Sequence, residues 1–148
     1  MLIHLDEQLI TICHDISLEL PADFVGLAIY DHDGNHLKWK YAVGNRNDKY
    51  KRIVVRYGKG ISGHVIRSGR SMMITSFPHL IIGKPTEYPI MLAEQLIAAI
   101  AVPIYYKQSP WGVLLGGNRY KYSFTSKHLS LLNKKAQDIE KILQNCID

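Results

Sequence analysis

A run of ten mainly apolar residues, 97–106, constrains this fold more than any other feature of the chain. It reads Ile-Ala-Ala-Ile-Ala-Val-Pro-Ile-Tyr-Tyr and contains no charged side chain. A strand this apolar is typical of the centre of a sheet, and Pro103 predicts a local irregularity within it. The turn residues 107–110 and the apolar run 112–117 predict that the next strand returns antiparallel beside the first.

Amphipathic helices are predicted at both ends of the chain. Apolar residues recur at helical spacing over residues 2–20, and Pro21 ends that pattern. A second helix is predicted from Thr125, a good N-cap, with a stripe of Leu129, Leu132, Ala136, Ile139 and Leu143. Because each helix needs an apolar surface to cover its stripe, we expect the two to pack together on one face of the sheet.

Shorter elements fill the rest of the chain. Turn residues separate apolar runs that predict strands, while a long aperiodic segment predicts a loop lying over the sheet. The expected strands are 24–30, 37–41, 53–57 and 71–76, the expected short helices are 64–68 and 92–96, and the expected loop is 78–89. The fold class is therefore α/β, one domain over residues 1–148. It has a mostly antiparallel sheet of about six strands, with the terminal helices on one face and short helices and loops on the other.

Composition excludes several classes of protein. The chain is 47% hydrophobic and 21% charged, which is typical of a globular domain. It has no apolar run of the roughly 18 to 20 residues that cross a bilayer and no signal-peptide pattern at its start, so we expect a cytoplasmic protein without a membrane partner. Cys13 and Cys146 have no CxxC spacing and the seven histidines have no metal-ligand spacing, so no metal is expected.

Positive charge is concentrated in the middle of the chain. Between Lys38 and Arg70 there are ten Lys or Arg residues and one acid, Asp48. Such a surface attracts anions, acidic protein surfaces or nucleic acid. The chain has no helix-turn-helix, zinc-finger or RNP-like pattern, so a nucleic-acid partner is not expected.

A glycine turn is the first candidate for a ligand site. Residues 58–63 read Gly-Lys-Gly-Ile-Ser-Gly between an expected strand and an expected helix. Glycines let the backbone approach a ligand closely, and the first amides of a helix can hold an anion. Turns of this type also serve packing alone, and the sequence leaves both interpretations open. His64, just after the turn, is interpreted as a surface residue.

Several motifs together resemble the GAF domain family. They are Gly58 to Val65, Gly69, Ile100-Ala101-Val102-Pro103-Ile104, Gly112-Val113-Leu114, and Phe124-Thr125 through Leu131-Leu132. A narrower resemblance, to the nitrate receptors of firmicute nitrate-regulatory systems, rests on Leu37 to Tyr41, Gly44-Asn45, Tyr50 to Val54 and Glu87-Tyr88-Pro89-Ile90. The likeness covers nearly the whole chain, and it implies the same α/β sandwich.

The resemblance also implies a ligand and the residues that bind it. In those receptors a nitrate ion lies beneath the loop, held by main-chain amides and walled by a tryptophan and apolar side chains. The matching residues of this chain are Trp39, Ile61, Ser62, Tyr88, Pro89 and Ile90. Fixed N–H donors with apolar walls suit a weakly hydrated, planar monoanion. Two alternatives stay open: Trp39 is plain core, or Ser62 caps its own helix.

The resemblance implies a non-catalytic sensor, not an enzyme, that modulates a sensor histidine kinase controlling nitrate and nitrite respiration, with no cofactor besides the ligand. One alternative is a GAF module for a larger ligand. Another is an enzyme like the free methionine sulfoxide reductases, which need thiols near the pocket, whereas both cysteines here lie in terminal helices. The apolar stripes of those helices could also pair two copies into a homodimer.

Overall fold

The computed structural model describes residues 2–147, which form one six-stranded sheet in the order β3-β2-β1-β6-β5-β4. Every neighbouring pair is antiparallel. The strands are β1 (Phe24–Asp31), β2 (His36–Val43), β3 (Val54–Arg56), β4 (Met72–Ile74), β5 (Ala98–Tyr106) and β6 (Ser109–Asn118). The run 97–106 forms an interior strand, as expected, because β5 lies between β6 and the edge strand β4, while β1 and β6 are the two middle strands.

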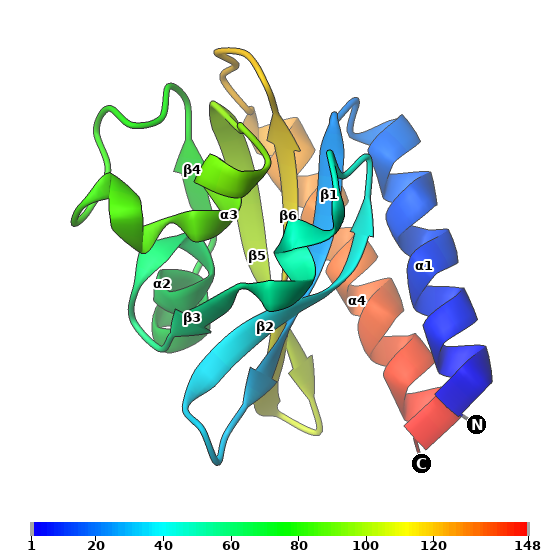
Figure 1. The fold of residues 1–148 in the computed structure, drawn as a ribbon. Helices are drawn as coiled ribbons and strands as arrows, with labels where there is room; N and C mark the ends of the chain where they lie inside the picture. The colour runs from blue at the N-terminus through cyan, green and yellow to red at the C-terminus, as the bar shows by residue number, and fades with distance from the viewer. Residues whose placement is uncertain (1, 148) are drawn as a thin grey trace.

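The helices divide between the two faces of the sheet (Figure 1). The long helices α1 (Leu2–Glu19) and α4 (Ser126–Ile147) pack together on one face, as expected. The opposite face carries α2 (Gly60–Ser68), α3 (Pro89–Ala93) and the 3-10 helices η1 (Asp48–Arg52) and η2 (Pro85–Glu87). The predicted α/β sandwich is therefore confirmed, and its sheet is antiparallel throughout.

Each face of the sheet has its own apolar core. On the helix side, Leu9, Ile16, Leu132 and Ile139 pack with inward-facing strand residues such as Leu27. A second buried cluster lies between the sheet and the short helices. Its buried aromatic residues are Phe24, Trp39, Tyr50, Phe77 and Tyr88. The candidate ligand site belongs to this second core.

A β-bulge in β2 sets which aromatic side chain faces which core. Strict alternation would put Trp39 and Tyr41 on the same face of the sheet. The register shifts between Leu27, which pairs with Tyr41, and Ala28, which pairs with Trp39, so Lys40 is an extra residue in β2. Trp39 therefore joins the core beneath the short helices, whereas Tyr41 turns to the opposite core and donates a hydrogen bond to Asp6 of α1.

Two predicted helices were placed wrongly. The helix expected at 64–68 begins earlier, at Gly60, so most of the predicted glycine turn is helical. Its glycines have low helix propensity, and the start is stabilised by tertiary packing rather than by sequence. The helix expected at 92–96 is α3, which begins at Pro89, a residue that suits the first position of a helix. The two 3-10 helices were not predicted, since such short turns carry little periodicity.

The two cysteines lie on the helix side of the molecule. Cys13 of α1 is buried in that core, and burial raises the pKa of its thiol to about 12. Cys146 of α4 is half-buried and accepts a hydrogen bond from Gln8 Nε2 at 3.2 Å.

No helix within residues 2–147 is long and apolar enough to cross a membrane.

We expect only Cys146 to react with a thiol reagent such as DTNB in the native protein at pH 8, because the thiolate is the reactive form and Cys13 is both buried and neutral. The unfolded thiol titrates near 9.0, so the native preference for the neutral thiol stabilises the fold below that pH and is lost as the pH rises toward 12. Native Cys146→Ser should show almost no reaction. Rapid labelling of this variant at Cys13 would contradict the assignment.

Candidate functional site

The start of α2 and the start of α3 are brought into direct backbone contact. Gly60 is the first residue of α2 and has φ +63°. A Cβ atom at this position would lie 2.3 Å from the carbonyl oxygen of Glu87 and 3.7 Å from Cα of Tyr88. Only glycine allows this approach without displacing the backbone. Gly60 and residues 87–88, distant in the sequence, therefore lie side by side.

The structure places all six candidate residues around this contact or in the core beneath it. Trp39, Ile61, Tyr88 and Ile90 belong to one buried cluster, and Ser62 is buried as well. Pro89 is half-buried at the start of α3. The side chains come from β2, α2 and α3, so three separate elements supply the candidate site.

Neither of the two helix starts has a side-chain cap. The first amides of a helix have no acceptor within it. Lys59 is the N-cap of α2 and makes no side-chain capping hydrogen bond, so the amides of Ile61 and Ser62 are not capped by it. Ser62 is the third residue of α2 and does not occupy the N-cap, contrary to the alternative interpretation. In α3, Tyr88 is the N-cap, and the amide of Ile90 likewise precedes the first internal bonds.

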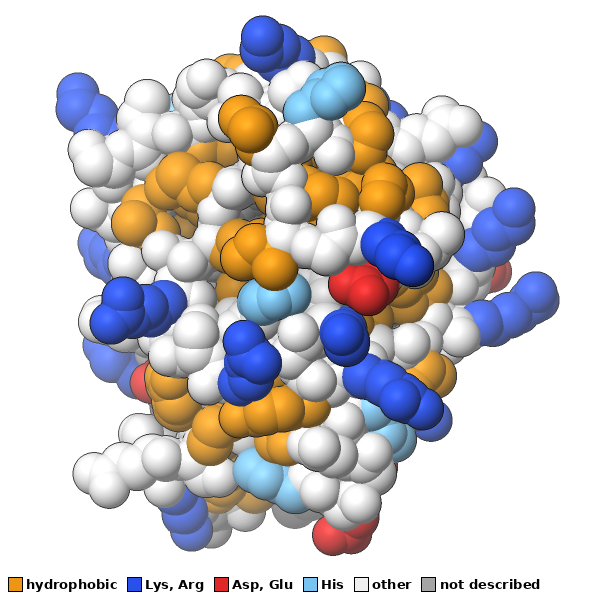
Figure 2. Space-filling view, turned by 90° about the vertical axis from the view of Figure 1, so that its left-hand side faces the viewer, with side chains coloured by type: hydrophobic (Ala, Val, Ile, Leu, Met, Phe, Trp, Pro, Cys, Tyr) orange, Lys and Arg blue, Asp and Glu red, His pale blue; other side chains and the backbone are white. Residues whose placement is uncertain are grey.

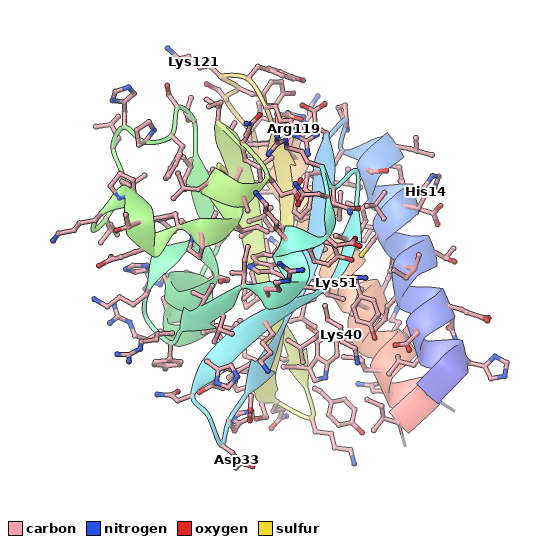
Figure 3. The ribbon with its side chains drawn as sticks, viewed as in Figure 1. His14, Asp33, Lys40, Lys51, Arg119 and Lys121 are labelled. Atoms are coloured by element: carbon pink, nitrogen blue, oxygen red, sulfur yellow. The ribbon has the colours of Figure 1, made fainter. Side chains whose placement is uncertain are left out.

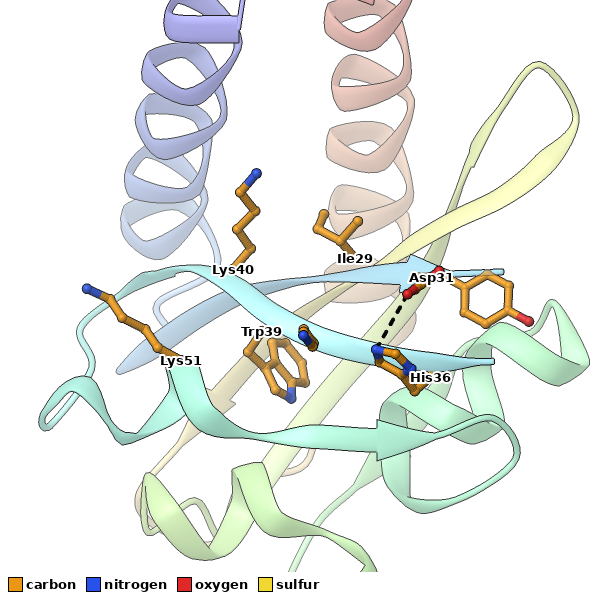
Figure 4. Close-up of a pocket in the computed structure, with 8 residues that line it drawn as sticks. Ile29, Asp31, His36, Trp39, Lys40 and Lys51 are labelled. Carbon is orange, nitrogen blue, oxygen red and sulfur yellow. Dashed lines mark ion pairs between the residues drawn. The ribbon is translucent and has the colours of Figure 1, made fainter. Parts of the chain in front are cut away.

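Trp39 brings a buried polar group that has no partner. The residue is 2% exposed, and its Nε1 lacks a hydrogen-bond partner among the described residues. Figure 4 shows the ring on the side of β2 away from α1 and α4, with its nitrogen turned away from the sheet. Gly26 makes room for it, since a Cβ there would be 3.0 Å from the indole. An unpaired buried N–H costs about 1–3 kcal/mol, which a ligand acceptor would recover.

Tyr88 joins the site to the loop above it. Its side chain is fully buried, its ring packs against Phe77 with centroids 5.7 Å apart, and its hydroxyl donates a hydrogen bond to the carbonyl oxygen of Ile82 at 2.6 Å. Burial raises the pKa of the Tyr88 hydroxyl above its usual value, so the group remains a donor at neutral pH. The position of loop 78–84 is thus tied to a residue of the site.

A basic concavity opens beside Trp39. It has a volume of about 400 Å³ and is lined by Ile29, Tyr30, Asp31, His36, Lys38, Trp39, Lys40 and Lys51. In Figure 4, Lys40 and Lys51 lie on one side of Trp39, and His36, which pairs with Asp31 at 3.7 Å, lies on the other. The other five candidate residues do not line it. Its lysines raise the local concentration of anions near the site.

A buried ion pair fixes the far end of α3. Glu94 is fully buried, and its Oε1 accepts hydrogen bonds from the Arg46 amide and from Arg119 Nη2, both at 2.8 Å. Arg119 also donates to the carbonyl oxygens of Glu94 and Gly44. Arg119, labelled in Figure 3, follows the last residue of β6. The network connects α3 to the loop before η1 and to the sheet.

Three features of the site were not predicted. Gly60 was assigned to the turn but not to the contact with Glu87, since nothing local marks a partner that far away. Gly26 is an isolated glycine inside a strand pattern, which is a usable signal of close packing. No local pattern marks Glu94 as a buried residue, because its partners Arg46 and Arg119 are distant in the sequence.

Among residues 2–147, no three His, Cys, Asp or Glu side chains gather to hold a metal ion.

These features define an α/β sandwich with a buried, donor-rich site between its sheet and a layer of short helices. The sequence model of the GAF domain matches residues 5–144. The chain belongs to the GAF domain family, which confirms the resemblance drawn from its motifs.

Solved structures show a likeness to particular members of the GAF family. A structure of NreA from Staphylococcus aureus, mutated in its nitrate-binding site, is 34% identical with a TM-score of 0.74, over 81% of this chain and 89% of that one. A hypothetical protein from S. aureus is 36% identical with a TM-score of 0.69, over 76% of this chain and 94% of that one. No curated protein sequence matches the chain significantly.

A third similar structure shares the fold alone. The free methionine-R-sulfoxide reductase from Neisseria meningitidis, in complex with its substrate, has a TM-score of 0.78 but only 16% identity, over 95% of this chain and 78% of that one. The GAF fold therefore accommodates enzymes as well as binding proteins, and the function of this chain has to be argued from its own residues.

Proposed function

We propose that this chain is a non-catalytic sensor that binds nitrate in its GAF domain and reports occupancy to a sensor histidine kinase controlling nitrate and nitrite respiration. The ion would lie against the amides of Ile61, Ser62 and Ile90, within the walls formed by Trp39, Tyr88 and Pro89. The proposal is supported by the identity of 34% to an NreA protein whose nitrate-binding site is named.

The unpaired indole N–H of Trp39 is the observation that carries the proposal. This donor shares a buried cluster with Ile61 and Ile90, which lie at uncapped helix starts, so the site is rich in donors. A monoanion with several acceptor oxygens can satisfy these donors together, whereas a cation cannot. Five of the six residues are buried, so a ligand bound among them would have to be small. A larger organic ligand would instead have to use the 400 Å³ concavity, which Trp39 alone of the six lines.

An enzyme like the methionine sulfoxide reductases is the less favoured function. That chemistry needs reactive thiols at the pocket. Cys13 belongs to the core on the opposite side of the sheet, and Cys146 packs against that same core. Turnover of free methionine sulfoxide by the Cys13→Ser, Cys146→Ser double variant would show that a different mechanism operates and would overturn this argument.

We expect Trp39→Phe to weaken nitrate binding about tenfold or more, because it removes the indole N–H and keeps an aromatic wall. A hydrogen bond to a charged group contributes about 1.5–3 kcal/mol. The measurement is isothermal titration with sodium nitrate against sodium chloride. The chain has two tryptophans, so Trp111→Phe on the helix-side core is the matched control and should bind like the wild type.

Thermal unfolding provides an independent check on the same proteins. Nitrate at a hundredfold excess over its dissociation constant should stabilise the wild type by about 2.7 kcal/mol. Equal nitrate affinity in both tryptophan variants, with normal stability in chloride, would remove Trp39 from the site.

The kinase partner is tested separately. Kinase autophosphorylation that responds neither to this protein nor to nitrate would overturn that part of the proposal.

A further inference from the structure

Apolar side chains are exposed on the loop above the site and on the adjacent helix α3. Leu80, Ile82 and Leu92, here called the loop patch, are all exposed, with Leu80 open to solvent over its whole side chain. Leu80 lines a hollow of about 590 Å³ together with Met73, His79 and Lys121. Leu92 lines a second hollow of about 320 Å³ with Phe77, Pro78, Pro85, Met91, Gln95, Leu96 and Ile97. The loop patch thus consists of exposed apolar side chains, two of which, Leu80 and Leu92, border hollows in the surface.

Basic side chains lie on the same face as the loop patch. Lys84 is in the loop, Lys121 lines the hollow beside Leu80, and Lys59 pairs with Glu87 at 3.9 Å. Figure 2 shows apolar side chains gathered on this face with Lys and Arg around them and few acids. A second copy of the chain would bring the same positive charge to the contact and be repelled. The charge therefore favours an occupant that is acidic around an apolar stripe.

The loop patch is linked to the anion site by Tyr88. Its hydroxyl holds the carbonyl oxygen of Ile82 in the loop, and its backbone adjoins Gly60 at the start of α2. The neighbouring Glu87 side chain packs on Gly83, where a Cβ would be 2.1 Å from Oε1. A ligand that moves segment 88–90 would therefore move the part of the loop that carries Ile82.

We propose that the loop patch docks an acidic, amphipathic helical segment of the partner protein, and that anion binding changes this affinity through the Tyr88–Ile82 hydrogen bond. The apolar stripe of the segment packs on Leu80, Ile82 and Leu92, and its carboxylates face the surrounding Lys and Arg side chains. The effect of the anion on this affinity rests on the proposed function, because it needs an anion at the site. Docking of the acidic segment on the loop patch does not depend on the proposed function.

The test uses the full chain and two synthetic probes. One is a fluorescein-labelled helical peptide with leucines at i, i+3, i+4 and i+7 and glutamates elsewhere, and the other has lysine in place of every glutamate. Fluorescence anisotropy is measured in sodium chloride and in sodium nitrate at equal ionic strength. The protein variants are the double variant Leu80→Ser, Ile82→Ser, the variant Tyr88→Phe, and the control Leu18→Ser, which changes an exposed leucine of α1.

We expect the glutamate peptide to bind wild type and Leu18→Ser alike, the double variant to bind it at least tenfold more weakly, and the lysine peptide not to bind. Nitrate should change the affinity of the wild type at least threefold and that of Tyr88→Phe much less. Equal binding of both peptides, or unchanged binding by the double variant, would overturn the docking surface. So would a dimer of the free chain in sedimentation that the double variant abolishes, since a second copy would then be the occupant.

Nitrate titration of the wild type separates the two possible failures. If nitrate binds with saturable heat but leaves the peptide affinity unchanged, the coupling is overturned while the proposed function stands. If nitrate gives no heat, the proposed function fails and the coupling with it. The anisotropy measurements in sodium chloride still decide whether the loop patch docks an acidic segment.

Discussion

Gly60→Ala is expected to abolish nitrate binding and to lower the free energy of unfolding by about 2–4 kcal/mol. Two costs combine at this position. Alanine is strained at φ +63°, and its Cβ would lie 2.3 Å from the Glu87 carbonyl oxygen, a backbone atom that cannot rotate away. Relief of the clash separates segments 60–62 and 88–90, and the amides then no longer converge on one ion. Isothermal titration and urea unfolding measure the two effects.

Gly69→Ala is the matched control at the opposite end of α2. Gly69 has a similar φ of +70°, but a Cβ there would meet only the Tyr105 hydroxyl, the end of a flexible side chain, at 2.8 Å. Gly69→Ala should therefore lower the free energy of unfolding by about 1–2 kcal/mol through backbone strain and keep wild-type nitrate affinity. If both variants lose stability equally and both bind nitrate, the close contact between the two helix starts has no role in the site.

Glu94→Ala is expected to lower the free energy of unfolding by about 3–5 kcal/mol, because removal of one member of a buried ion pair leaves the other charge uncompensated. Arg119, which pairs with Glu94 at 2.8 Å, would lose its carboxylate, and the Arg46 amide would lose its acceptor. Since Arg119 is partly exposed, the lower end of that range is the better estimate. The end of α3 should loosen, and nitrate affinity should fall with it.

Glu19→Ala provides the comparison for this result. Glu19 is exposed and pairs with Lys135 at 2.7 Å, a distance as short as that in the buried pair. Its partner Lys135 is half-buried, but the Glu19 carboxylate stays in water, so loss of the pair should cost about 1 kcal/mol or less and this variant should unfold almost like the wild type. Glu94→Gln should recover part of the loss, because an amide oxygen can still accept from Arg46. Losses of the same size in Glu19→Ala and Glu94→Ala would show that burial of the pair does not matter.

Much of the fold was predictable because periodicity and turn chemistry are local properties. The stripe of Leu132 and Ile139 predicted α4, and the uncharged run 97–106 predicted the interior strand β5. Boundaries failed where a tertiary contact overrode propensity. Helix α2 begins with the poor helix formers Gly60 and Gly63, because Gly60 packs against Glu87 and Tyr88, and Gly63 packs against the backbone of residues 56–58.

The resemblance supplied the residues of the candidate site, but the sequence could not supply their geometry. The motifs pointed to Trp39 and to the segments around Ser62 and Tyr88. Alternation could not show that Lys40 is an extra residue in β2 and that Trp39 therefore faces a different core from Tyr41. It also could not show that the indole N–H remains unpaired, since hydrogen-bond partners depend on residues distant in the sequence.

The sequence by itself determined the α/β sandwich, the two amphipathic terminal helices and the basic middle of the chain, since all of these follow from the order and spacing of residue types. The GAF family followed from the resemblance of its motifs. Only the tertiary structure decided that Gly60 adjoins Glu87, that Tyr88 holds Ile82, and that Glu94 pairs with Arg119. The physical reason is that a site made of unpaired donors exists only when separate elements pack closely. Such packing is set by the whole core rather than by any one segment.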